Sequence, residues 1–94
     1  MITDERREDA KGLVLLIACH MGVAYDDVMK QGEVPAVVRA RDISALLVRR
    51  KYGLTYFQLG DFFGQHPVTI KLATYRAARC KWSRRMVDEL REKM

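Results

Sequence analysis

Apolar residues recur at intervals of three and four along most of this 94-residue sequence. The spacing i, i+3, i+4, i+7 is that of a helix with one face turned toward a core. The first stretch covers residues 3–21, and its stripe comprises Ala10, Leu13, Val14, Ile17, Ala18 and Met21. Six glycines and two prolines are too few for a loop-rich or all-β fold. We therefore predict a single all-α domain over residues 1–94.

Local signals divide the rest of the chain into further helices, giving five to six in all. They are expected at about 25–30, 35–51, 56–63, 67–79 and from residue 83 onward. Glycines that can adopt positive φ stand after three of these segments, at Gly22, Gly53 and Gly64. Thr55 and Gln58 have the spacing of a capping box, in which each residue satisfies an end group of the other. Pro35 and Pro67 fit the first turn of a helix.

The third predicted helix carries a second apolar stripe. It comprises Val37, Ala40, Ile43, Ser44, Leu47 and Val48. Arg39 and Arg49 fall off this stripe, and Arg41 lies near its edge. We expect these arginines to be surface groups.

Positive charge is concentrated in the middle of the chain. Residues 39–85 contain eleven Lys/Arg and only two acids, Asp42 and Asp61, for a net charge of +9. The remaining residues carry −4, so the whole chain carries +5. This polarity favours a polyanionic partner for the central segment, with an ordinary solvated basic surface as the alternative.

The helices predicted at 56–63 and 67–79 are separated by about three residues that include Gly64. This is the pattern of a helix-turn-helix, whose second helix enters the major groove of duplex DNA. An ordinary helical hairpin is the alternative. Candidate DNA contacts on and around the motif are basic groups, polar groups and one valine that can offer methyl contact: Arg39, Arg41, Arg49, Thr55, Gln65, His66, Val68, Thr69, Lys71 and Arg76. His66 either contacts a base or caps the fifth helix.

The stretch from Val37 to Gly64 resembles the C-terminal DNA-binding domain of the bacterial replication initiator DnaA. The matching positions are Arg41, Leu47, Thr55, Leu59-Gly60 and Phe63-Gly64, and the likeness extends over about residues 10–80. The resemblance implies a helix-turn-helix that binds double-stranded DNA in replication initiation control or transcription regulation. It also implies that Arg41 reaches the minor groove and that Arg49 contacts a phosphate.

The resemblance is interrupted in the recognition motif. The family has Gly-Arg-Asp-His-Thr-Thr-Val after Phe-Gly, whereas this sequence has Gln-His-Pro-Val-Thr-Ile at 65–70. The Arg-Asp-His trio has no counterpart, so we do not expect preference for the initiator's usual box sequence. A phosphate-binding loop like that of the family's ATPase domain is also missing from the sequence.

Other function classes find little support. Two Cys and two His show no zinc-ligand spacing, and no nucleophile–base pattern stands out, so we expect no metal, no cofactor and no enzyme. Cys19 and Cys80 are expected to be buried thiols. The longest apolar run, at 13–19, is too short for a membrane span, and a charged N-terminus is unlike a signal peptide, which favours the cytoplasm.

The alternative function is a helical protein-interaction module. Its partner would dock on the acidic N-terminal helix or on the apolar C-terminal one, where Met86, Val87 and Leu90 are expected to lie together. Trp82 is expected to pack between the last two helices, with base stacking as the alternative.

Overall fold

The computed structural model describes residues 3–30, 34–80, 84–85 and 88–89. Its helices are α1 (Asp4–Met21), α2 (Tyr25–Met29), α3 (Pro35–Tyr52), α4 (Tyr56–Phe63) and α5 (Pro67–Arg79). The described ranges contain no strand, so the all-α prediction is confirmed. Each of these helices lies within one residue of its predicted bounds. Of the predicted last helix, 84–85 and 88–89 are helical, whereas Trp82, Ser83, Met86, Val87 and Leu90 lie outside the described residues.

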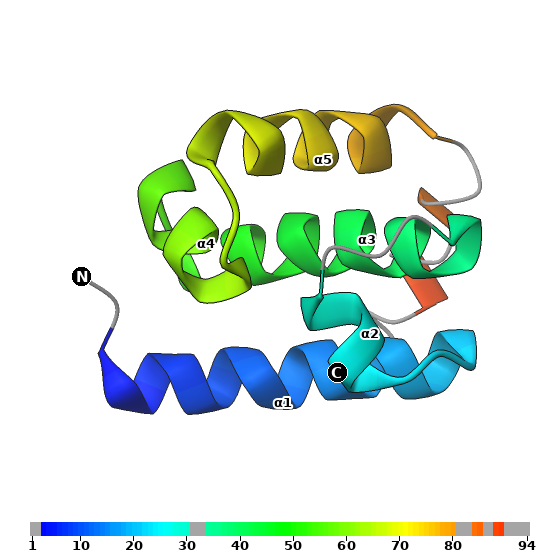
Figure 1. Ribbon diagram of the computed structural model, residues 1–94, viewed down its shortest axis with the longest axis horizontal. Coiled ribbons are helices and arrows are strands. Elements are labelled where there is room, and N and C mark those ends of the chain that lie inside the picture. Colours follow the sequence, from blue (N-terminus) through cyan, green and yellow to red (C-terminus); the bar gives the residue numbers. More distant parts are fainter. Residues whose placement is uncertain (1–2, 31–33, 81–83, 86–87, 90–94) are drawn as a thin grey trace.

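Helix α3 occupies the centre of the fold (Figure 1). Helix α1 packs along one side of it and α5 along the other. The short α2 contacts both α1 and α3, and α4 contacts α5 and α3. Helix α5 and the outer face of α1 therefore lie on opposite sides of α3.

The central position of α3 buries more of it than its apolar stripe predicts. The predicted stripe is buried, including Ser44, which is fully enclosed. Yet every residue from 40 to 48 is buried, because other helices cover α3 on several sides. Two charged residues, Arg41 and Asp42, are thus brought into the interior, and each requires a partner there.

The helix ends follow the predicted local chemistry. Gly22, Gly53 and Gly64 adopt left-handed conformations, with φ of 70°, 64° and 67°. Thr55 accepts a hydrogen bond from the backbone N–H of Gln58, and the Gln58 side chain accepts one from the backbone N–H of Thr55. The capping box therefore fixes the start of α4 at the position predicted.

The prediction for the cysteines is wrong, because both Cys19 and Cys80 are exposed and neither forms a disulfide. Cys19 follows Ala18 directly, and a step of one residue turns it away from the buried stripe of α1. Cys80 is the C-cap of α5, beyond the last packed turn of that helix.

None of the described helices is both long and apolar enough to cross a membrane.

Candidate nucleic-acid interface

Helices α4 and α5 are joined by residues 64–66 and pack against each other. Gly64 ends α4 in the left-handed conformation, and the backbone N–H of Gln65 donates to the carbonyl of Gly60. His66 then caps α5, since its Nδ1 accepts from the backbone N–H of Val68 at 3.1 Å. Of the two roles predicted for His66, the capping role is the one present. This bond leaves the proton of a neutral ring on Nε2.

Gly60 allows the close approach of α4 to the connection. A Cβ at this position would lie 2.5 Å from the carbonyl oxygen of Gln65 and 3.3 Å from the nitrogen of Pro67. Both are backbone atoms, so no side chain can move aside to relieve the contact. Only glycine fits here, and the angle at which α5 leaves the connection depends on it.

Arg41 is the candidate that the structure places least suitably for DNA. Its side chain is buried, at 7% exposure. Its Nε donates to the carbonyl of Val28 at 2.7 Å, and Nη2 donates to the carbonyls of Asp27 and Lys30. Burial lowers the pKa of Arg41, but a guanidinium stays charged at any ordinary pH. We therefore correct its assignment: Arg41 holds the end of α2 onto α3.

Both acids of the basic segment are occupied by arginines. Asp42 receives two hydrogen bonds from Arg76, from Nε and from Nη2, each 3.0 Å long. These bonds raise the pKa of Arg76 and tie α5 to α3. Asp61 on α4 pairs with Arg7 of α1 at 2.9 Å. The α4–α5 region therefore presents no carboxylate without a cationic partner among the described residues.

Two cations meet tyrosine rings where α3, α4 and α5 converge. The guanidinium carbon of Arg49 lies 4.5 Å from the centre of the Tyr56 ring. The Nζ of Lys71 lies 5.9 Å from the same ring and 5.7 Å from that of Tyr75. We call Arg49, Tyr56, Lys71 and Tyr75 the Tyr56 cluster.

The cations of the Tyr56 cluster have no carboxylate within ion-pair distance in the described part of the chain. The Nε of Arg49 is buried without a hydrogen-bond partner. Tyr56 is the first residue of α4, so the cluster adjoins the positive end of that helix. Such a site can attract an anion, because no carboxylate of the described residues already neutralises it.

The remaining candidates divide by exposure. Arg39, Thr55, Val68, Thr69 and Lys71 are exposed, whereas Gln65 is half-buried in the connection. Three large apolar or aromatic side chains of this region are exposed as well: Phe57 of α4 at 79%, and Leu72 and Tyr75 of α5 at 52% and 45%. For α5, the positions of the buried residues indicate which residues lie on the opposite, exposed face of the helix.

A scan against protein-family models and a search of curated proteins both find no match for this sequence. The likeness to the initiator domain therefore stays a prediction that rests on the residues quoted for it. Support for a functional site comes from the side chains of the α4–α5 region.

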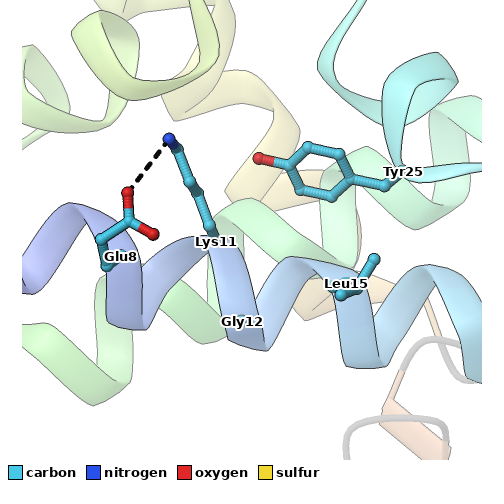
Figure 2. A pocket seen from close by; sticks show the side chains of 5 residues that line it. All are labelled: Glu8, Lys11, Gly12, Leu15 and Tyr25. Carbon is cyan, nitrogen blue, oxygen red and sulfur yellow. Dashed lines mark hydrogen bonds and ion pairs between the residues drawn. The ribbon is translucent and has the colours of Figure 1, made fainter.

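A separate hollow lies on the other side of the molecule. It is lined by Glu8, Lys11, Gly12 and Leu15 of α1 and by Tyr25 of α2 (Figure 2). The side chain of Lys11 donates a hydrogen bond to Glu8 at 3.3 Å. Partial burial of Tyr25 raises the pKa of its hydroxyl group. Leu15 is 56% exposed at the edge of the hollow. The lining is mainly aliphatic and aromatic, with its one lysine already paired to a carboxylate.

Proposed function

We propose that α4 and α5 form a helix-turn-helix that binds duplex DNA, with α5 as the recognition helix. The observation that carries this proposal is the Tyr56 cluster beside the exposed face of α5, whose two cations have no carboxylate partner within the described ranges. Aromatic rings limit the freedom of both cations while leaving their charge available, which suits them to the phosphate backbone. Pairing of Asp42 and Asp61 with arginines removes the main source of repulsion.

Thr55 and the first turn of α4 contribute to the same proposed contact. The capping box satisfies the backbone N–H groups of Thr55 and Gln58, but not those of Tyr56 and Phe57. Those two groups are among the end donors that a helix leaves for an outside acceptor. A phosphate beside Tyr56 would accept from them and from the Arg49 guanidinium together.

Binding to a random-sequence duplex should weaken steeply with salt. Each phosphate contact contributes about −0.9 to the slope of log affinity against log salt concentration. Lys71→Ala and Arg49→Ala should each flatten the slope by about one unit and weaken all sequences alike. A fluorescence-anisotropy titration at several salt concentrations measures both quantities.

Lys30→Ala is the matched control for Lys71→Ala. It removes the same charge from the C-cap of α2, a helix that packs against α1 and α3. The side chain of Lys30 is exposed and makes no ion pair in the described residues. The control should leave the salt slope unchanged. If no duplex binds even at low salt, or if Lys30→Ala flattens the slope as much as Lys71→Ala, the proposed interface is wrong.

A substitution at Thr69 distinguishes sequence-specific contacts with bases from sequence-independent contacts with the phosphate backbone. Thr69 is exposed in the first turn of α5, where its hydroxyl and methyl can reach base edges. Thr69→Ala should cost about 1–3 kcal/mol on a site selected from random DNA and little on non-specific DNA. Circular dichroism should show unchanged helicity. Equal affinity of parent and variant for the selected site would place the recognition residues elsewhere.

A second candidate function is docking of a protein at α1, favoured by the hollow beside Leu15 and Tyr25. Leu15→Ala separates the two functions, because Leu15 belongs to α1, which packs on the side of α3 opposite α5. It should leave duplex affinity unchanged if DNA is bound through α4 and α5.

A further inference from the structure

The outer face of α5 is apolar where a DNA-reading helix would meet base edges. Helix α5 buries Ile70, Ala73, Thr74 and Ala77 against the rest of the fold. Opposite them, Val68 and Leu72 are 57% and 52% exposed, one helical turn apart. Thr69, also exposed, adds a third methyl group beside them. We call Val68, Thr69 and Leu72 the methyl patch.

The charges around the methyl patch favour DNA as its occupant. Helix α5 contains no acidic residue, and Lys71 and Arg79 are exposed on it. Lys71 precedes Leu72 in the sequence and belongs to the Tyr56 cluster, so the proposed phosphate contact adjoins the methyl patch. An apolar strip on a helix whose charged residues are all cations matches the major groove, where base edges lie between two phosphate backbones.

The side chains at the N-terminal end of α5 lack the groups that read guanine or adenine. Arg or Lys reads guanine and Asn or Gln reads adenine through paired hydrogen bonds. Between 67 and 74 the only such residue is Lys71, whose ammonium lies near two tyrosine rings. Gln65 is half-buried, and His66 uses Nδ1 to cap the helix. Besides the Thr69 hydroxyl and the Nε2 of His66, methyl contact is therefore the main means of direct readout that these side chains offer.

We propose that α5 recognises the 5-methyl groups of thymines through Val68 and Leu72, with Thr69 between them. Thymine is the only standard base that offers a methyl group in the major groove. Side chains four residues apart on a helix are about 5–6 Å from each other, and successive base pairs are about 3.4 Å apart. The two thymines should therefore lie one or two base-pair steps apart. This inference rests on the proposed duplex binding and names the chemistry that the same surface would read.

Uracil substitution tests the inference, because uracil keeps every polar group of thymine and lacks only the methyl. A site is first selected from random duplex DNA, and each thymine in it is then replaced singly. At two thymines within two base-pair steps, uracil should weaken binding about four-fold, the effect of losing one buried methyl-sized group. Leu72→Ala should abolish the uracil effect at one of them, and Val68→Ala at the other.

Leu15→Ala is the matched control, because Leu15 is as exposed as Leu72 but lies on α1. It should preserve both uracil effects. If the selected duplex binds in a salt-dependent way and no uracil weakens it, or if both uracil effects persist in Leu72→Ala and Val68→Ala, the methyl readout is wrong while duplex binding stands. If no duplex binds at low salt, the proposed function falls and the readout with it.

Discussion

Arg41→Ala is expected to lower the free energy of unfolding by about 3 kcal/mol. The buried guanidinium donates to the carbonyls of Asp27, Val28 and Lys30. Alanine removes this donor, and of the three carbonyls that of Asp27 keeps a hydrogen bond from the backbone N–H of Lys30. In a domain of this size, the loss corresponds to a fall in Tm on the order of 15 °C. Urea denaturation followed by circular dichroism measures the change. Arg41→Lys should fall between parent and alanine variant, because lysine keeps the charge but not the fork of donors.

Arg50→Ala provides the control for this loss. Arg50 lies on the same helix but is exposed, and substitutions at such surface positions usually change stability by less than about 0.5 kcal/mol. The comparison also decides between two roles for Arg41. An Arg41→Ala variant as stable as the parent but unable to bind duplex DNA would return Arg41 to the interface, as the sequence had suggested.

Gly60→Ala is expected to destabilise the domain by about 2 kcal/mol, although alanine is the better helix former. The added Cβ would lie 2.5 Å from the carbonyl oxygen of Gln65, and the contact can be relieved only by moving the connection to α5. Duplex affinity should fall as well, because α5 and the Tyr56 cluster would no longer be aligned. Denaturation and binding are measured on the same variant.

Gly12→Ala is the matched control and should have the opposite sign. Gly12 lies inside α1, and a Cβ there meets no atom within 4 Å. Replacing it should therefore stabilise the domain by about 0.5–1 kcal/mol. Stabilisation by Gly60→Ala to the same extent would mean that α4 does not approach the connection as closely as described.

The sequence predicted the helices well because their ends depend on residues only a few positions apart. The capping box of Thr55 and Gln58 and the left-handed glycines act through neighbouring backbone groups, whatever surrounds them. The apolar stripe predicted for α1 also agrees with the residues buried there, since other helices cover α1 on one side. The three-residue connection between α4 and α5 was visible for the same local reason.

The sequence did less well wherever the outcome depended on several helices at once. Stripe analysis places Arg41 near the surface, but α2 folds over it and supplies three carbonyls from residues 27–30. The charge pattern along the sequence includes Asp42 and Asp61, but it does not show that Arg76 and Arg7 reach them from other helices. The likeness to the initiator family carried the same error, because it assigned Arg41 by position alone.

Sequence by itself thus determined where each helix begins and ends and where positive charge accumulates along the chain, since both are local properties. Tertiary structure decided which of those charges are available. It enclosed Arg41, paired Arg76, and left Arg49 and Lys71 beside tyrosine rings, with no carboxylate partner for either among the described residues. The physical reason is that a charge is neutralised or exposed by whatever packs against it, and those neighbours come from distant parts of the sequence.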